Sequence, residues 1–183
     1  RDRPNMKRSI YLLPLFIFLV IVGYFAVGLN MNPRDIPSML LDQKVPHFDL
    51  APIKGSKRGF SHKDLSGQVA LINIFGSWCA ACLAEHPFLM EISTKGLIPI
   101  YGIDWREKNP DDGPRWLAQR GDPYTLIGDD PKSKVAIALG VTGAPETLFV
   151  DKSGFIRYKH VGPITPKNWQ SKLWPLVQEL QEQ

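Results

Sequence analysis

The chain has 183 residues, which is enough for one domain with a sizeable core and an additional segment. Its net charge of +4 comes mainly from the first eight residues, which hold four basic groups and one acidic group, whereas residues 9–183 hold 18 and 17. A nearly neutral remainder of mixed charges has no basic stripe, so the composition argues against nucleic-acid binding. The two cysteines fit an exported domain in an oxidising compartment, where stray thiols are liabilities.

The N-terminal part of the sequence predicts a membrane anchor. Residues 10–29 form a run of 20 residues without a charge, and a helix of that length spans the ~30 Å hydrocarbon core of a bilayer. The basic residues within 1–9 predict a cytoplasmic N-terminus by the positive-inside rule. Residues 30–43 are then expected to form a linker, and residues 44–183 a domain beyond the membrane. A cleavable signal peptide is the alternative, with Ala26-Val27-Gly28 as a loose cleavage site, but the apolar run exceeds the usual ~7–15 residues.

The domain begins with weak signals that are followed by a strong one. Val45–Pro52 predicts a short strand, and Phe60–Leu65 predicts a turn or helical piece. Val69–Phe75 is a short apolar run that ends at a small-residue turn, which predicts a strand buried on both faces. From Cys79 the residues suit a helix, and Gly96 ends it. The two cysteines therefore fall at the start of a helix that follows a central strand.

The rest of the domain continues the alternation of strands and helices. Leu97–Ile103 supplies a second apolar strand, and this strand–helix–strand succession implies a right-handed crossover and a parallel pair. A polar excursion, Asp104–Gly121, adds an insertion after this second core strand. The remaining expected elements are a helix through Trp116 and Leu117, a short strand at Tyr124–Ile127, a turn at Asp129–Pro131, a helix at Lys132–Leu139, a hairpin of Glu146–Asp151 and Phe155–Val161, and a last helix capped by Thr165 and kinked at Pro175. The pattern predicts an α/β fold.

Cys79 and Cys82 have the spacing and the position of a redox pair. The first turn of a helix carries unpaired N–H groups and partial positive charge, which stabilise a thiolate over a thiol. Cys79 is therefore expected to be acidic and to attack disulfides, because the thiolate is the reactive species. Cys82 follows three residues later on the same helix face, close enough to close a disulfide and release a mixed disulfide.

Two other uses of the cysteines compete with redox chemistry. A zinc site needs about four ligands. Beyond Cys79, Cys82 and His86, the chain offers only three histidines, none at ligand spacing: His47, His62 and His160. We therefore predict no metal. A purely structural disulfide stays open, although a bridge that closes so short a loop removes little entropy from the unfolded chain and stabilises weakly.

A second segment completes the predicted site. Gly143-Ala144-Pro145-Glu146 stands directly before the hairpin. An X-Pro bond takes the cis form at a cost of only ~0.5–1 kcal/mol, although an ordinary trans proline is the simpler expectation. Together with Trp78-Cys79-Ala80-Ala81-Cys82 after a buried strand, the segment resembles the thioredoxin fold, a central mixed sheet flanked by helices. The resemblance implies that Pro145 is cis and faces the cysteines, and that the Ala144 backbone pairs with an extended substrate.

The resemblance extends beyond the fold. Cys79-x-x-Cys82-x-x-Glu85-His86, the segment Gly140–Thr147 (GVTGAPET) and the N-terminal anchor together resemble the cytochrome c biogenesis thioredoxins, the CcmG/DsbE type of thiol:disulfide interchange protein. The likeness covers nearly the whole chain. It implies a reductant that is anchored in the bacterial inner membrane, faces the periplasm, and keeps the CxxCH cysteines of apocytochrome c reduced, directly or through a partner thiol protein. Its electrons would come from a membrane thiol transporter, and no cofactor is implied beyond the redox-active disulfide.

One departure from the general thioredoxin pattern leaves the proton chemistry open. General thioredoxins carry a buried aspartate six residues before the first cysteine, but this chain has Asn73 there, as this subfamily tends to. Because Asn73 cannot take a proton, another acid must serve Cys82. Glu85, one turn further along the helix, and Glu146, beside Pro145, are the two candidate catalytic acids.

The likeness also implies a docking surface of four residues: Trp78, Thr142, Ala144 and Pro145. Thr142 stands where relatives often have an aromatic residue, and Leu83 where many have arginine, so the likeness does not fix substrate affinity or reduction potential. A disulfide oxidase or isomerase on the same fold is the alternative enzyme, because the direction of exchange depends on that potential. A haem or metal chaperone is the non-enzymatic alternative, supported only by His86 and His160.

Overall fold

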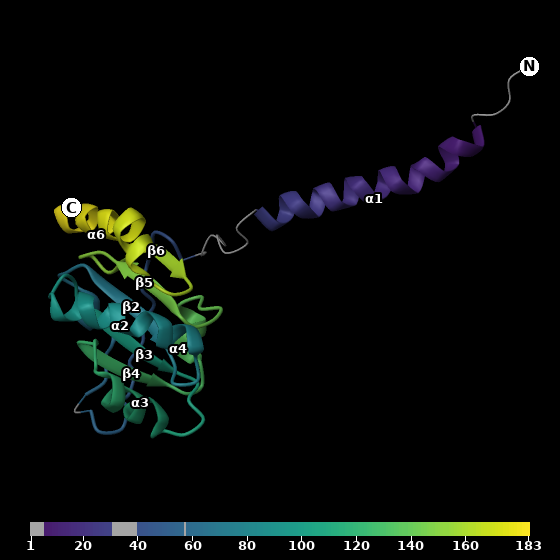
Figure 1. Ribbon diagram of the computed structural model, residues 1–183. Helices are drawn as coiled ribbons and strands as arrows, with labels where there is room; N and C mark the ends of the chain where they lie inside the picture. The colour runs from purple at the N-terminus through teal and green to yellow at the C-terminus, as the bar shows by residue number, and fades with distance from the viewer. Residues whose placement is uncertain (1–5, 31–39, 57) are drawn as a thin grey trace, which may run out of the picture. The chain divides into compact units, whose positions relative to one another are not determined.

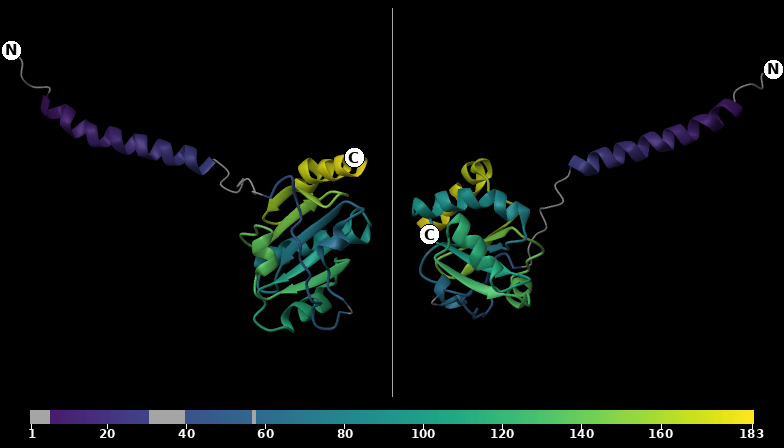
Figure 2. Two further views of the ribbon diagram at one scale, coloured as in Figure 1. Left: turned by 180° about the vertical axis from the view of Figure 1, so that it is seen from behind. Right: turned by 60° about the horizontal axis from the view of Figure 1, so that its bottom comes forward.

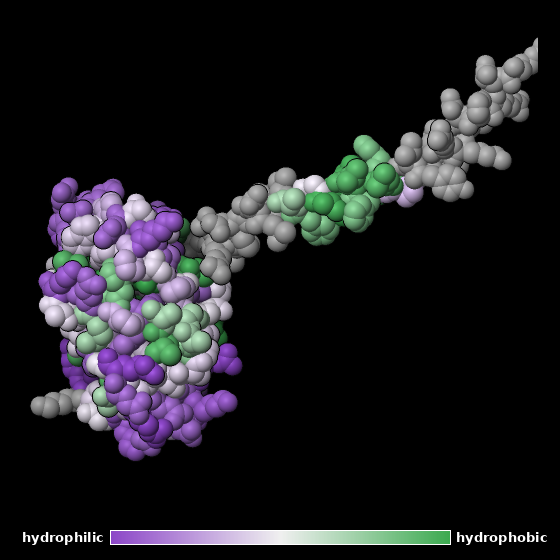
Figure 3. Space-filling model, in the orientation of Figure 1, coloured by the Kyte–Doolittle hydropathy of each residue, from purple (hydrophilic) through white to green (hydrophobic). Residues whose placement is uncertain are grey.

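A computed structural model describes residues 6–30, 40–56 and 58–183, which fall into two compact units divided after Ile36. The first unit contains helix α1 (Met6–Asn30). Its described side chains, Leu13–Ala26, are exposed and predominantly hydrophobic (Figure 3). Within the described part of the chain, no helix is long and apolar enough to cross a membrane. The anchor over residues 10–29 stays a prediction, and most of the predicted linker lies outside the described residues.

The second unit is built on a mixed six-stranded sheet with the strand order β1-β6-β5-β2-β3-β4 (Figure 1). The strands β2, β3 and β4 are parallel, whereas β5 is antiparallel to β2, and β6 is antiparallel to β5 and β1. The strand bounds are β1 (Gln43–Lys44), β2 (Ala70–Phe75), β3 (Ile100–Trp105), β4 (Leu126–Asp130), β5 (Glu146–Val150) and β6 (Phe155–Val161). A mixed sheet of this kind is the architecture that the resemblance implies.

Helices cover both faces of the sheet (Figure 2). Their bounds are α2 (Ala80–Thr94), α3 (Asp112–Arg120), α4 (Lys134–Ala138), α5 (Pro166–Asn168) and α6 (Trp174–Glu182), with a 3₁₀ turn η1 (His62–Leu65) and a π-helical turn η2 (Trp169–Leu173). Alternate side chains of β2 enter two separate cores, because successive residues of a strand point to opposite faces. Leu71 and Phe75 pack with α2, α3 and the C-terminal helices, whereas Ile72 and Ile74 pack with α4 and the segment before β2.

The sheet register brings three parts of the predicted site to one edge. Phe75, the last residue of β2, lies opposite Asp104 of β3, and Ile74 lies opposite Glu146, the first residue of β5. The carboxyl end of β2 leads within four residues to Cys79, and Pro145 directly precedes β5. The cysteine pair, the end of β3 and the proline segment therefore share the same edge of the sheet.

Two predicted boundaries are wrong at the sheet edges. Val45–Pro52 is not a strand: it makes only the isolated bridges Asp49–Ser61 and Pro52–Gly128, and the edge strand is β1, two residues long. The turn expected at Asp129–Pro131 begins only at Pro131, because β4 pairs with β3 as far as Asp130. The Asp130 carboxylate accepts hydrogen bonds from the amides of Lys134 and Ala136, at 2.9 and 2.8 Å, so this acid both ends the strand and caps α4.

The C-terminal helix is interrupted where a kink is predicted. Thr165 caps α5 as expected, through a hydrogen bond of 3.2 Å from the Asn168 amide to the Thr165 hydroxyl. The turn η2 then intervenes, with the Trp174 amide bonded to the Trp169 carbonyl, and α6 begins with Pro175 in its first turn. Proline has no backbone N–H to donate inside a helix. The wider turn η2 places Pro175 in the first turn of a new helix, where no such donor is needed.

Candidate active site

The two cysteines lie at the amino end of α2 and are joined in a disulfide, with their Cα atoms 5.2 Å apart. Cys79 is the N-cap residue of the helix, and its sulfur accepts a hydrogen bond of 3.0 Å from the Cys82 amide. A donor at this position stabilises negative charge on the sulfur once the disulfide is reduced, in addition to the field of the helix. Cys79 is 5% exposed and Cys82 only 1%, so the outer sulfur is the one that an incoming disulfide can reach.

Trp78 forms the exposed rim beside the disulfide. Trp78 is 49% exposed, but its indole is fixed in place. Nε1 donates a hydrogen bond of 3.0 Å to the Trp105 carbonyl, and the ring centroids of Trp78 and Trp105 lie 5.8 Å apart. Leu83, one residue after Cys82, is also exposed at 40%. An apolar, fixed rim next to a reactive sulfur is suited to dock a partner protein, because rigid aromatic side chains bury much area at little entropic cost.

Glu85 is buried one helical turn beyond Cys82 and is 1% exposed. One carboxyl oxygen accepts a hydrogen bond of 2.9 Å from the Asn73 amide group, and the other accepts one of 2.8 Å from the backbone amide of Ile164. Burial raises the pKa of Glu85 from 4.5 to about 7, against the opposing effect of these two donors. A carboxyl group with a pKa near neutrality exchanges protons readily at physiological pH.

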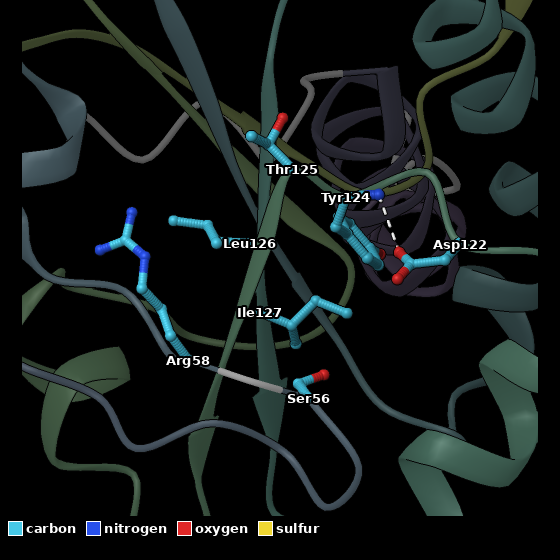
Figure 4. Close-up of a pocket in the computed structure, with 7 residues that line it drawn as sticks. All are labelled: Ser56, Arg58, Asp122, Tyr124, Thr125, Leu126 and Ile127. Atoms are coloured by element: carbon cyan, nitrogen blue, oxygen red, sulfur yellow. Dashed lines mark hydrogen bonds between the residues drawn. The ribbon is translucent and has the colours of Figure 1, made fainter.

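Asn73 holds Glu85 in place and is itself fully bonded. Its amide group also donates to the Thr147 hydroxyl at 3.0 Å, and its oxygen accepts from the Tyr124 hydroxyl at 2.8 Å. Tyr124 also lines a surface pocket of about 300 Å³ with Arg58 and neighbouring residues (Figure 4). Sequence reasoning missed the role of Tyr124, because this residue lies just before β4, 51 residues from Asn73 in the chain.

The raised pKa of Glu85 predicts a pH-dependent stability. A buried carboxyl whose folded pKa exceeds its unfolded value favours folding below about pH 4.5 and loses that contribution as the pH rises through about 7. Glu85→Gln removes this group. We expect the variant to gain roughly 3 kcal/mol relative to the unmodified oxidised protein between pH 4 and pH 8. Urea unfolding of both proteins across this range measures the difference, and a difference that stays constant with pH contradicts the burial of an ionisable carboxyl.

The proline segment has the predicted conformation, because the Ala144–Pro145 peptide bond is cis. Ala144 packs against the core cluster that contains both cysteines. Glu146 ties the segment down, since one of its carboxyl oxygens accepts hydrogen bonds from the Thr142 and Gly143 amides, both at 3.0 Å, and from the Thr142 hydroxyl. Thr142 is thus bonded into the turn that precedes Pro145.

Glu146 also forms a buried ion pair, with its second oxygen 2.8 Å from the ammonium group of Lys159. The side chains are 1% and 8% exposed. One oxygen of Glu146 is thus occupied by three donors and the other by a cation. Of the two acids proposed from the sequence, the contacts favour Glu85 for proton exchange and Glu146 for holding the proline segment.

The histidines that would support a chaperone have other contacts. His86 is buried, bonds through Nε2 to the Gly121 carbonyl at 3.1 Å, and packs edge-on against Trp116. His160 bonds to the Pro163 carbonyl at 3.3 Å. Among the residues that the structure describes, no group of three or more His, Cys, Asp or Glu side chains is arranged to hold a metal ion. Both side chains are packed, and burial lowers the pKa of each imidazole.

Comparison with known proteins agrees with this site. A model of the Redoxin family matches residues 41–173. The chain is 41% identical over 175 residues to the thiol:disulfide interchange protein DsbE of Pseudomonas aeruginosa, covering 96% of each chain, and 34% identical to the DsbE of Escherichia coli, covering 93% of this chain and 95% of the relative. A crystal structure of a putative DsbE from Chlorobium tepidum shares the fold, with a TM-score of 0.64, 24% identity, and coverage of 75% of this chain and 95% of that one.

These relatives and the CxxC disulfide establish the chemistry as thiol–disulfide exchange, and the fold as thioredoxin-like. The chain is a protein-disulfide oxidoreductase, and it belongs to the redoxin family, within the CcmG/DsbE type of thiol:disulfide interchange protein.

Proposed function

We propose that the protein works as a reductant in cytochrome c maturation and keeps the CxxCH cysteines of apocytochrome c, or of a partner thiol protein, in the dithiol form. The observation that carries the proposal is the Cys79–Cys82 disulfide at the amino end of α2, with the Glu85 carboxyl buried one turn beyond the resolving cysteine. A reductant must release its own substrate by a second, internal attack, and that attack requires a base beside Cys82.

The reaction transfers two electrons in two exchange steps. The Cys79 thiolate attacks one sulfur of the substrate disulfide, forms a mixed disulfide and expels the other substrate sulfur, which takes a proton from water. Glu85 then accepts the proton of Cys82, and the Cys82 thiolate attacks the Cys79 sulfur. The Cys79–Cys82 disulfide forms, the second substrate sulfur leaves, and it takes the proton that Glu85 holds. Trp78 and the Ala144–Pro145 segment present the edge on which the substrate docks.

The location and the partners of the protein are proposed from its sequence. The uncharged run of residues 10–29, preceded by basic residues, supports a single-pass anchor in a bacterial inner membrane with the redox domain in the periplasm. The same family resemblance supports a membrane thiol transporter as the electron donor, and no cofactor beyond the disulfide.

The reduction potential of the Cys79–Cys82 pair tests the direction of the reaction. We expect a value nearer the ~−270 mV of thioredoxin than the ~−120 mV of a strong oxidant such as DsbA. The full chain is equilibrated in detergent with defined ratios of reduced and oxidised dithiothreitol or glutathione, and the oxidised fraction is counted after alkylation of free thiols. A potential near ~−120 mV overturns the proposal in favour of a disulfide oxidase. As a second readout, the reduced protein should open the disulfide of a CxxCH peptide faster than that of a peptide with both cysteines but no histidine.

A further inference from the structure

The last residue of β3 and the segment that follows it are bonded at three points to the loop that carries the active site. The backbone amide of Ser77 donates to one carboxyl oxygen of Glu107, and the Ser77 hydroxyl donates to the other at 2.7 Å. The third bond is the one from the Trp78 indole to the Trp105 carbonyl. Ser77 and Trp78 are the two residues directly before Cys79, so the polar excursion holds the loop that leads into the redox pair.

The loop has little freedom to find another arrangement. A Cβ atom added at Gly76 would lie 2.5 Å from the Trp78 indole nitrogen and 3.1 Å from the Trp105 carbonyl oxygen. The loop therefore lies against Trp105 with no space between them, and Glu107 supplies the only charged group among the three bonds. Hydrogen bonds to a carboxylate are roughly twice as strong as those between neutral groups.

A second carboxyl group lies behind Glu107. Asp104 is 2% exposed, and its oxygen Oδ1 has no hydrogen-bond partner among the described residues. Burial and the neighbouring Glu107 carboxylate raise the pKa of Asp104, which favours its protonated form. A Cβ atom at Gly113 would lie 1.9 Å from Asp104 Oδ2, so α3 approaches this buried carboxyl as closely as a residue without a side chain allows.

We propose that Glu107 is a positioning residue of the exchange reaction: through Ser77 it fixes the loop that presents Trp78 to the substrate. This inference rests on the proposed function, and it gives the insertion after β3 a role in substrate docking. Glu107 touches neither the sulfur atoms nor the substrate in this scheme, so its loss weakens docking and leaves the chemical steps intact.

The arrangement predicts a pH at which docking weakens. Burial, and then the neighbouring carboxylates of Glu107, Asp129 and Asp112, raise the pKa of Asp104 from 3.8 to about 8. Arg115 of α3 is paired with Asp112 at 3.2 Å. Above about pH 8 Asp104 loses its proton, two adjacent carboxylates repel each other, and the bonds from Glu107 to Ser77 weaken.

The test compares variants of the full chain in detergent. Glu107→Gln leaves only one oxygen for the two Ser77 donors, and Ser77→Ala is a milder variant that removes the hydroxyl donor alone. Asp104→Asn keeps a donor toward Glu107 at every pH, because an amide does not ionise in this range. Glu91→Gln is the matched control, since Glu91 is an exposed glutamate on α2 with a lysine partner. The readouts are kcat and KM for reduction of an oxidised CxxCH peptide from pH 6 to pH 9, and the ¹H–¹⁵N chemical shift of the Ser77 amide.

For Glu107→Gln we expect a KM raised about five- to tenfold with kcat within about twofold, and a smaller rise for Ser77→Ala. KM of the unmodified protein should rise above about pH 8, whereas KM of Asp104→Asn should stay flat. The Ser77 amide proton should move upfield in Glu107→Gln and, above about pH 8, in the unmodified protein.

The proposal is overturned if KM of Glu107→Gln equals that of Glu91→Gln, or if the Ser77 amide chemical shift is the same in these two variants. A protein that reduces no peptide at all refutes the proposed function instead, and the Ser77 shift still tests whether Glu107 fixes the loop.

Discussion

Replacing Cys82 by alanine is expected to abolish turnover and to leave the protein joined to its substrate. The first attack needs only Cys79, whose sulfur keeps its helix N-cap position and its hydrogen bond from the backbone amide of residue 82. The second attack needs the missing sulfur, so the mixed disulfide persists. Mixing the reduced variant with an oxidised CxxCH peptide should give a stoichiometric adduct that dithiothreitol releases, visible by mass spectrometry. In membranes, the protein captured by this variant identifies the partner.

The acid beside Cys82 should control the rate of the same step. In Glu85→Gln we expect the mixed disulfide to form at its normal rate and to resolve about 10²-fold more slowly, because the general base is lost. In the unmodified protein the resolving rate should fall as the pH drops below about 7, where Glu85 is protonated, and this inflection should vanish in the variant. Quenched single-turnover reactions at pH 5–9 separate the two steps.

The controls separate loss of a base from general damage. Glu91→Gln changes an exposed glutamate of the same helix and should leave both steps unchanged. Cys79→Ala should form no adduct at all. An adduct formed by Cys79→Ala, or a Glu85→Gln variant that resolves as fast as the unmodified protein, contradicts the assignment of attacking sulfur and base respectively.

The centre of the domain was predictable because its signals are local. The strand β2 is apolar on both faces, the residues after Cys79 favour helix, and a glycine turn separates β5 from β6, so the predicted elements are confirmed to within a few residues. The edges of the sheet were not predictable in this way. β1 is two residues long and exists only through its pairing with β6, and β4 continues to Asp130 only because β3 provides a partner.

For the site, too, local features were predictable from the sequence, whereas features that depend on distant contacts were not. Spacing placed both cysteines on one helix, but the cis Pro145 bond came from family resemblance and not from composition. The choice between Glu85 and Glu146 depends on contacts far apart in sequence, with Ile164 for the first and Lys159 for the second. Likewise, Glu107 lies in a polar excursion whose composition predicts an ordinary loop, and only its contact with Ser77 connects it to the site.

The buried pair of Glu146 and Lys159 leads to the largest expected effect on stability. Glu146→Gln keeps an oxygen for the Thr142 and Gly143 amides but leaves the Lys159 ammonium, 8% exposed, without a counter-charge. Among the described residues, Lys159 then retains its bond of 2.6 Å to the Gly140 carbonyl. We expect the free energy of unfolding to fall by about 3–5 kcal/mol, the usual consequence of breaking a buried ion pair on one side. Urea unfolding at pH 7 measures it.

A double variant shows whether the loss comes from an uncompensated charge. Adding Lys159→Met to Glu146→Gln removes the stranded ammonium, so most of the lost stability should return, because an apolar side chain often replaces a buried pair at no cost. The exposed pair of Glu91 and Lys95 is the comparison, and Glu91→Gln should cost no more than about 1 kcal/mol. If Glu146→Gln costs as little as Glu91→Gln, or if the double variant is less stable than the single one, the proline segment is not held by a buried charge pair.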